Sequence, residues 1–289
     1  MHFVKAKGIL SAHGGMNLYR GCSHGCIYCD SRSKCYQMEH DFEDIEIKEN
    51  AIKLLEEAIA KKRKKCMIGT GAMTDPYTPL SPDPCNMRRA LELIYKYGFG
   101  VTVHTKSDRV LNDIDMLKKI NERTKAVVQM TLTTYDDELC RKIEPNVCPT
   151  SRRREVLEIL SSEGIPTVVW LSPILPFIND TAENISGIID ICERAGVYGI
   201  ICFSMGVTLR EGSREYFYKK LDEKFPGMKE KYIKNYGNNY YVDSPKNPEL
   251  MRLFHQKSEG AGIVHGNDKI FEYLYKFEEK DLQMSLWEL

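Results

Sequence analysis

The sequence has no excess of either charge, because 41 lysines and arginines stand against 41 aspartates and glutamates among its 289 residues. Proteins that bind nucleic acid or membrane surfaces usually carry a basic surplus, so the overall charge supports neither class. No apolar run reaches the ~18 residues that a membrane-spanning helix needs. Residues 1–15, MHFVKAKGILSAHGG, also lack the long apolar core of a signal peptide. We therefore expect a cytoplasmic protein without membrane contact.

Cysteine is the residue type whose distribution is uneven. Four of the ten cysteines lie between Cys22 and Cys35, and the other six are scattered. Disulfides are rare in the cytoplasm, where clustered cysteines more often bind metal or take part in chemistry. The clustered cysteines are therefore the main functional signal in the sequence.

Short apolar runs alternate with amphipathic stretches from about residue 46 to residue 204. Strands are predicted at 16–20, 66–69, 100–104, 126–131, 167–171 and 199–203. Helices are predicted at 48–62, 87–97, 110–121, 152–162 (with Thr150 or Ser151 as N-cap) and 182–194. Continuous apolar strands are typical of a parallel sheet covered by helices on both faces. Six such units predict an α/β fold, a partial (βα)6 TIM-like barrel with ligands at the carboxyl ends of its strands.

The pattern changes after about residue 205. Helices are predicted at 214–225, 248–259 and 268–277, and residues 236–241 read as a loop. We expect a partial-barrel domain over residues 1–205 and a helical C-terminal extension, packed on the barrel, over residues 206–289.

Residues 19–29, YRGCSHGCIYC, space Cys22, Cys26 and Cys29 as C-x3-C-x2-C. Thiolates favour iron–sulfur clusters and zinc, but zinc sites usually combine paired C-x2-C motifs into four protein ligands. Three cysteines would leave one iron of a cubane without a protein ligand, and an open metal position implies chemistry. Two alternatives use Cys35 as a fourth ligand: a zinc loop, or a cluster that only carries electrons.

This spacing, with the aromatic Tyr28 directly before the last cysteine, resembles the signature of radical S-adenosylmethionine enzymes. The resemblance implies a [4Fe–4S] cluster on Cys22, Cys26 and Cys29 whose open iron binds the amino and carboxylate groups of S-adenosylmethionine. It implies reductive cleavage to a 5′-deoxyadenosyl radical, which abstracts hydrogen from a substrate. It also implies oxygen sensitivity, a reductant such as flavodoxin or ferredoxin, and the partial (βα)6 barrel of the family.

Further segments look like the branch related to spore photoproduct lyase. They are NLYRGC at 17–22, GTGAMTDPY at 69–77, HTKS at 104–107, MTLTT at 130–134, IEP at 143–145 and PILP at 173–176. The later ones follow successive predicted strands, and the likeness covers roughly residues 14 to 205. The resemblance therefore extends over most of the chain and weakens in the tail.

The resemblance also assigns positions around the cofactor. Thr74 and Lys106 match residues that hold the cofactor carboxylate, which fits because an ammonium pairs with a carboxylate. The small residues Gly71 and Ala72 would let the backbone approach the cofactor. The other positions implied are Tyr28 in the cysteine loop, the hydroxyl of Thr131 near the cofactor and Ile174 against the adenine.

Two positions depart from the photoproduct lyases. Met73 occupies the place of their hydrogen-donor cysteine, and Asp30 occupies the place of a tyrosine that follows the third cluster cysteine. A methionine has no S–H to give, and both positions belong to the hydrogen-return path of the lyases. The hypothesis is that this chain keeps the cofactor machinery without being a working photoproduct lyase.

Four residues near the predicted mouth of the barrel are candidates for substrate contact: Asp75, Tyr77, Arg109 and Glu144. Asp-Pro and Glu-Pro steps also favour turns, and Arg109 fits a helix start equally well. The run Arg152–Arg154 begins a predicted helix on the same side, where cations oppose the helix dipole and an anionic partner is expected.

Three classes of function stay open. The first is a nucleic-acid-modifying or repair enzyme, the second a peptide- or small-molecule-modifying enzyme, and the third a non-catalytic iron–sulfur electron-transfer protein. Salt-dependent binding to DNA or RNA would favour the first. Cys140 and Cys148, with Cys35 or Cys85, could hold a second cluster, although their irregular spacing argues against it.

Overall fold

A six-stranded parallel sheet forms the centre of the protein, which is described here by a computed structural model covering residues 1–80 and 82–280. Its strands follow the order β2-β5-β6-β7-β8-β9, and each neighbouring pair is parallel. Their bounds are β2 Gly15–Met16, β5 Met67–Thr70, β6 Gly100–Thr105, β7 Ala126–Thr131, β8 Thr167–Trp170 and β9 Gly199–Ile201. The sheet curves without closing between β2 and β9, which confirms the predicted partial barrel.

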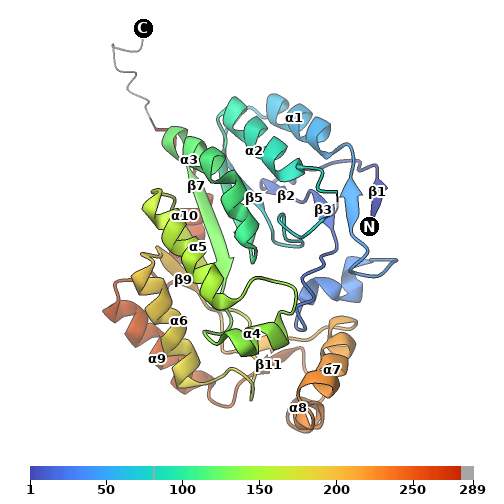
Figure 1. Ribbon diagram of the computed structural model, residues 1–289, viewed down its shortest axis with the longest axis vertical. Helices are drawn as coiled ribbons and strands as arrows, with labels where there is room; N and C mark the ends of the chain where they lie inside the picture. Colours follow the sequence, from blue (N-terminus) through green and yellow to red (C-terminus); the bar gives the residue numbers. More distant parts are fainter. Residues whose placement is uncertain (81, 281–289) are drawn as a thin grey trace.

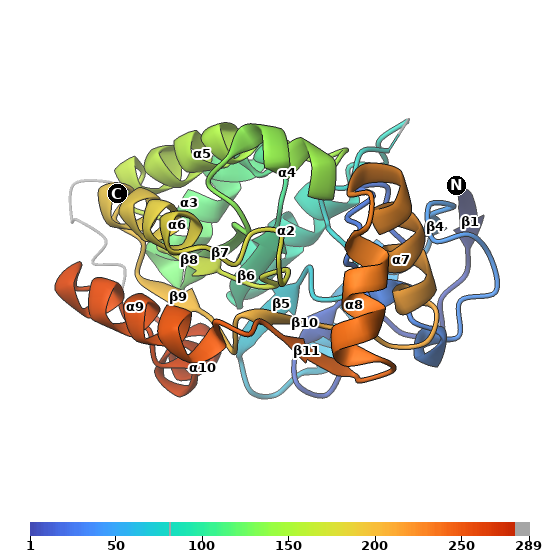
Figure 2. The same cartoon turned by 90° about the horizontal axis from the view of Figure 1, so that it is seen from below.

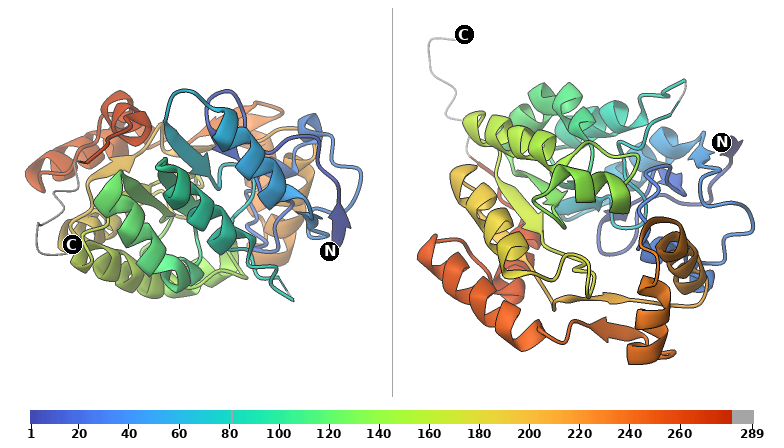
Figure 3. Two further views of the ribbon diagram at one scale, coloured as in Figure 1. Left: turned by 90° about the horizontal axis from the view of Figure 1, so that it is seen from above. Right: turned by 60° about the horizontal axis from the view of Figure 1, so that its bottom comes forward.

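Helices cover the outer face of this sheet, as Figures 1 and 3 show. They are α1 Ala51–Lys61, α2 Asn86–Tyr97, α3 Ile114–Arg123, α5 Thr150–Ser162 and α6 Ala182–Arg194, while α4 Asp137–Ile143 lies beyond the carboxyl end of β7, next to the cysteine loop. Helix α1 shows why they pack: Ala51, Leu55 and Ile59 recur every four residues on one face, and all three are buried. Burying each large aliphatic side chain contributes roughly 1.5–3 kcal/mol.

The longest predicted strands and helices lie close to where the sequence indicated, and shorter features differ. Residues 16–20 form two separate short strands instead of one, because β3 (Tyr19–Arg20) pairs with β4 (Glu46–Lys48) and leaves the main sheet. The expected helix at 110–121 starts as a 3-10 turn, η3 (Asp108–Asp113). Pro149, and not Thr150 or Ser151, occupies the N-cap of α5.

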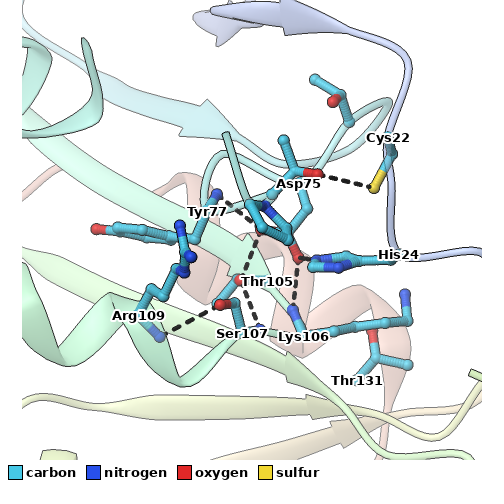
Figure 4. A network of polar contacts seen from close by, with 12 residues as sticks. Cys22, His24, Asp75, Tyr77, Thr105, Lys106, Ser107, Arg109 and Thr131 are labelled. Carbon is cyan, nitrogen blue, oxygen red and sulfur yellow. Dashed lines mark hydrogen bonds and ion pairs between the residues drawn. The ribbon is translucent and has the colours of Figure 1, made fainter. Parts of the chain in front are cut away.

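A small sheet of order β1-β4-β3 brings the chain into the cysteine loop. Strand β1 is His2–Val4, and β3 ends directly before Gly21. The loop runs into two short 3-10 turns, η1 (Asp30–Arg32) and η2 (Lys34–Tyr36). The carboxyl ends of β5 and β6 face this loop, so residues from three parts of the chain meet there (Figure 4).

The C-terminal part is less purely helical than expected. Its elements are β10 Gly206–Thr208, α7 Ser213–Lys224, α8 Met228–Tyr236, β11 Tyr241–Asp243, α9 Asn247–Gly260 and α10 Asn267–Tyr275. Strands β10 and β11 form an antiparallel pair in a region where no strand was predicted. Figure 2 shows this pair reaching from the barrel toward α7 and α8. In Figure 3 these two helices lie beside the N-terminal segment, where Lys34 N donates to Glu211 O (2.9 Å).

Within residues 1–80 and 82–280, the longest apolar helical stretches are too short or too polar to cross a lipid bilayer.

Candidate cofactor and substrate site

The three cysteines of the C-x3-C-x2-C motif line one small cavity of about 110 Å³ at the carboxyl ends of β5 and β6. Cys22 and Cys26 are buried, and Cys29 is partly exposed. Gly21 adopts a φ of +86°, and a Cβ there would lie 2.5 Å from the carbonyl oxygen of Phe42. The loop therefore needs glycine at the point where it turns into the cavity.

Backbone contacts from the segment after α4 support the cysteine loop. Ile27 N donates to Ile143 O (3.0 Å), and Asn146 N donates to His24 O (3.1 Å). The Asn146 side chain also donates to Ser23 O (2.8 Å). Residues more than a hundred positions apart thus fix the backbone that carries the thiols.

Burial dominates the acid–base properties of Cys22 and Cys26 in the absence of metal. It raises the pKa of Cys22 to about 11, and it raises the pKa of Cys26 well above its usual value. Thr78 Oγ1 lies 3.7 Å from Cys22 Sγ. Thiols that are costly to ionise alone become stable thiolates when a cation neutralises them, so the loop is suited to metal binding.

Asp75 forms the centre of a buried polar network (Figure 4). Its carboxylate accepts hydrogen bonds from Thr105 Oγ1 (2.7 Å) and from the backbone N–H of Lys106 (2.8 Å), and it lies 2.9 Å from His24 Nε2. It also accepts from Tyr77 N (2.9 Å). Burial acts to raise the pKa of Asp75, but His24 and the hydrogen bonds outweigh it and hold that pKa well below its usual value. The network joins the cysteine loop to the end of β6.

His24 was not singled out from the sequence, although it lies between two of the motif cysteines. It is 4% exposed and lines the small cavity. Its Nε2 faces Asp75, while its Nδ1 is buried without a hydrogen-bond partner among the described residues. Its place inside the C-x3-C segment was the available signal, because such residues border whatever the thiols bind.

Lys106 brings a positive charge to the cavity. Burial acts to lower its pKa, but Cys26, Glu144 and other nearby acidic groups outweigh it and raise the pKa above its usual value. Its Nζ lies 5.9 Å from the centre of the Tyr28 ring. The described residues offer its ammonium no carboxylate within 4.0 Å, so the charge is free to pair with a bound anion.

Of the other residues expected at the cofactor, some line the small cavity and some do not. Gly71, Ala72 and Thr74 line the small cavity, and the Thr74 hydroxyl donates to Gly21 O. Thr131 ends β7 and lies behind the cavity, where its Oγ1 is 2.8 Å from His104 Nε2. Ile174 is fully buried in the main core and lines neither this cavity nor the larger one beside it.

Gly71 illustrates how closely the strands meet at this point. Its φ is +99°, and a Cβ would lie 1.9 Å from the carbonyl oxygen of His104. Any side chain at this position would therefore push β5 away from the end of β6. His104 itself stacks on Trp170 at 5.0 Å between ring centroids.

Tyr28 connects the cysteine loop to a buried ion pair. Its hydroxyl donates to Glu144, and Arg153 Nη2 pairs with the same carboxylate. Arg153 also donates to Thr131 O (2.7 Å) and Cys148 O (3.1 Å). The anionic partner expected for the arginines at the start of α5 thus comes from the chain itself.

A larger cavity of about 540 Å³ adjoins the small one. The two share Tyr28, Cys29, Ser31, Ala72 and Lys106. The larger cavity extends to the ends of β8 and β9 and to the β10–β11 pair, and Asp30 and Trp170 are in its wall. Its volume is in the range of ordinary ligand sites, and its position matches that of barrel active sites.

The four candidates for substrate contact do not meet in this larger cavity. Asp75 borders only the small cavity, and Glu144 is fully buried. Tyr77 and Arg109 line a different cavity of about 110 Å³, where the Tyr77 hydroxyl donates to Asp113 Oδ2 (2.9 Å). The sequence placed all four near strand ends, but it could not show which way each side chain points.

The other cysteines considered as ligands lie apart from the small cavity. Cys85 is exposed and lines the separate cavity of Tyr77 and Arg109. Cys35 is exposed, and Arg210 Nη1 lies 3.5 Å from its sulfur. Cys140 is buried, with Arg153 Nη2 2.8 Å from its sulfur, and Cys148 Sγ donates to Lys106 O (3.3 Å). None of the four lines the cavity of the motif cysteines.

Sequence relatives are themselves uncharacterized. A protein of Methanocaldococcus jannaschii is 31% identical over 167 residues, which cover 57% of this chain and 61% of that protein. A protein of Mycobacterium tuberculosis is 24% identical over 245 residues, which cover 82% of this chain and 71% of the relative. These relatives extend the likeness over most of the chain without naming a reaction.

Solved structures share the fold at low identity. Spore photoproduct lyase complexed with dinucleoside spore photoproduct superposes with a TM-score of 0.64 at 14% identity, covering 86% of this chain and 74% of the lyase. A radical S-adenosylmethionine methyltransferase from Kitasatospora setae, with cobalamin and a [4Fe–4S] cluster bound, gives 0.51 at 13% identity over 72% of this chain and 37% of the methyltransferase. At these identities the likeness concerns the fold.

The family model of the radical SAM superfamily matches residues 16–185, more than half of the chain. That range begins at β2, includes the C-x3-C-x2-C loop and the end of β6, and finishes within α6. Enzymes of this family use a [4Fe–4S] cluster with S-adenosylmethionine and generally need an external reductant. The chain belongs to the radical SAM superfamily.

Proposed function

We propose that Cys22, Cys26 and Cys29 hold the [4Fe–4S] cluster and that the larger cavity beside them binds the substrate. The observation that carries this proposal is the shared wall of the two cavities: Cys29, Ala72 and Lys106 border both. A reactive group formed over the small cavity would therefore have direct access to a molecule in the larger one.

The donor set fits such a cluster. Three thiols line one cavity, and thiolates are the usual protein ligands of iron–sulfur clusters. The exposed Cys35 lies at Arg210, outside this cavity, which supports three protein ligands and one open iron. The cluster, when bound, supplies the electron that cleaves S-adenosylmethionine to a 5′-deoxyadenosyl radical.

The chain's own residues bind and orient the cofactor in this proposal. The ammonium of Lys106 pairs with the cofactor carboxylate, and Asp75 fixes the backbone of Lys106 through its N–H. Gly71 and Ala72 leave room for the cofactor beside the ends of β5 and β6, because neither carries a bulky side chain. Thr131 does not line the small cavity; in this proposal its hydroxyl positions the ring of His104 through a hydrogen bond.

The reaction we propose is hydrogen abstraction from a substrate in the larger cavity. Nucleic acid is one candidate substrate, since the lyase that shares this fold was solved with a dinucleoside photoproduct. Met73 and Asp30 argue against the lyase reaction itself, because neither supplies the thiol or phenol found at those places in the lyases. Turnover of photoproduct-containing DNA by the wild-type protein would refute that part of the proposal.

Production of 5′-deoxyadenosine tests the central step. The protein, reconstituted with iron and sulfide without oxygen and reduced with dithionite, should convert S-adenosylmethionine to 5′-deoxyadenosine and methionine. Cys22→Ala, Cys26→Ala and Cys29→Ala should each abolish the product, while Cys35→Ala should keep it. Loss of the product in Cys35→Ala at normal iron content would show that a fourth cysteine is a ligand.

A further inference from the structure

The wall of the larger cavity is rich in aromatic side chains that remain open to solvent. Phe203 is 58% exposed and Tyr241 is 69% exposed, which is unusual for such large apolar groups beside a cavity. Trp170 and Tyr240 complete this aromatic wall. Exposed aromatic rings that gather at one cavity mark a binding site more often than a solvated surface.

The rings are held in place by one another and by the surrounding frame. Trp170 lies 6.1 Å from Phe203 between ring centroids, and its Nε1 donates to Gln129 Oε1 (2.7 Å). Tyr240 and Tyr241 meet edge to face at 4.4 Å. The wall is therefore preorganised, so a ligand would lose little affinity to the ordering of these side chains.

The described side chains of the cavity wall offer no free positive charge once Lys106 binds the cofactor carboxylate. Lys106 is the cationic side chain among the lining residues, and the proposed function commits it to the cofactor carboxylate. Asp30 is neutralised by Arg210, whose Nε lies 3.3 Å from Asp30 Oδ1. The carboxylate of Asp243 has no ion-pair partner within 4.0 Å among the residues that the structure describes.

Arg210, the cation nearest to Asp30, is occupied by other groups of the chain. Its guanidinium donates to the hydroxyl of Tyr240 (2.7 Å), lies over the same ring at 5.0 Å and reaches the sulfur of Cys35. Arg210 does not itself line the cavity. A phosphate or carboxylate in the larger cavity would thus face the exposed carboxylate of Asp243 without a compensating cation in the wall, and the two like charges would repel each other.

We infer that the substrate presents an organic cation, an amine or guanidinium, to this wall. Aromatic faces attract cations through their quadrupole, and Asp243 supplies the opposite charge. The inference rests on the proposed function, because it takes the larger cavity as the substrate site and Lys106 as a cofactor ligand. The same chemistry fits a free amine or the side chain of a lysine or arginine in a peptide.

Binding to the cluster-loaded, unreduced protein with S-adenosylmethionine present tests the inference by calorimetry. The probes are phenethylamine, 2-phenylethanol and 3-phenylpropionate, which differ mainly in charge. The amine should bind about tenfold more tightly than the alcohol, as expected for one cation–π contact plus one ion pair, and more tightly still than the acid. Comparing the affinity of an acetylated Gly-Lys-Gly amide with that of its Gly-Glu-Gly counterpart tests whether the cation can come from a lysine side chain in a peptide.

Variants locate the effect. Asp243→Asn should remove most of the preference for the amine over the alcohol, whereas Glu259→Gln, which changes an exposed carboxylate on α9, should leave it intact. Phe203→Ala should weaken the binding of the amine and the alcohol together. The inference would be overturned if the three probes bound equally or if the acid bound most tightly. It would also be overturned if a single-stranded oligonucleotide bound more tightly than the amine at 150 mM salt, a concentration near physiological.

The binding assay and the cleavage assay test the two proposals separately. Normal 5′-deoxyadenosine production with no amine preference would reject only the cationic substrate. Selective amine binding without any 5′-deoxyadenosine would reject the proposed function, and with it the identification of the bound amine as a substrate.

Discussion

Glu144 and Arg153 form an ion pair in which both side chains have no exposed surface. Burial acts to raise the pKa of Glu144, but Arg153 and Lys106 outweigh it and lower that pKa below its usual value. The hydroxyl of Tyr28 donates to the same carboxylate. The pair thus anchors the cysteine loop to α5 through one phenol.

Arg153→Met should strongly destabilise the protein, because it leaves the Glu144 carboxylate buried without its partner. Breaking a buried pair in this way costs about 3–5 kcal/mol in the free energy of unfolding. Urea unfolding without oxygen measures this value. Arg154→Met, at the half-exposed neighbouring position where the arginine pairs with the solvent-accessible Glu158, should change it by less than about 0.5 kcal/mol.

A double variant separates the effect of an unpaired buried charge from the effect of losing the Glu144 acceptor. Arg153→Met combined with Glu144→Leu removes both charges, so it should recover part of the lost stability. Its cysteine loop would still lack the acceptor of the Tyr28 hydroxyl, so we expect its reconstituted cluster to lose iron faster than that of the wild type. Equal iron retention in the two proteins would show that the network stabilises the fold alone.

Asp75→Asn should weaken cofactor binding more than it weakens the fold. The amide keeps the shape of the carboxylate, but it cannot accept all the hydrogen bonds from Thr105, Lys106 and His24. The loss of charge-assisted hydrogen bonds, each worth about 1.5–3 kcal/mol, should raise the Kd for S-adenosylmethionine roughly tenfold or more. Calorimetry on the cluster-loaded protein measures it, and Asp190→Asn serves as the surface control. An unchanged Kd would remove Asp75 from the site.

Lys106→Met should raise the Kd for S-adenosylmethionine by about 30-fold or more, as expected when a buried charge loses its partner. The methionine keeps the length of the side chain while it removes the ammonium. Lys118→Met, in the exposed pair with Glu163, should leave the Kd unchanged. If both variants bind the cofactor like the wild type, the carboxylate is held elsewhere.

His104 should make the stability of the metal-free protein sensitive to acid. Burial, followed by the charge of Lys106, lowers the pKa of His104 to about 3. The unfolded chain, with a pKa near 6.5, binds the proton first, so this contribution to stability is present above pH ~6.5 and is lost as the pH falls toward 3. Urea unfolding at pH 7 and at pH 4.5 should show a smaller loss for His104→Gln than for the wild type. His255→Gln, at an exposed position on α9, should behave like the wild type.

The partial barrel could be predicted because its strands are apolar runs of sufficient length. Strand β7, at residues 126–131, is buried at every position, and the sequence signal matched its bounds. Strands β10 and β11 contain three residues each, and their pairing depends on a contact across more than thirty positions. No local pattern of three residues specifies such a contact, so this pair was missed.

At the site, too, residues near the ends of long strands could be predicted, and residues brought together by distant contacts could not. The motif cysteines, Lys106 and the small residues after β5 could be predicted because the family resemblance assigns their roles and because ligands of such a barrel lie at the carboxyl ends of its strands. Asp75 was a candidate for substrate contact near the barrel mouth, yet His24 and the end of β6 enclose it. The aromatic wall forms only because the segment that carries Tyr240 and Tyr241 passes over the carboxyl ends of β8 and β9. The hydrophobic periodicity of the sequence does not predict where that segment lies.

The central claim is that the cluster has one iron free to bind the cofactor, and electron paramagnetic resonance of the reduced, anaerobically reconstituted protein tests it most directly. We expect the signal of a [4Fe–4S]⁺ cluster whose g values shift when S-adenosylmethionine is added, in the wild type and in Cys35→Ala alike. A colourless protein with zinc at the three thiols, or a cluster signal that S-adenosylmethionine leaves unchanged, would contradict the account.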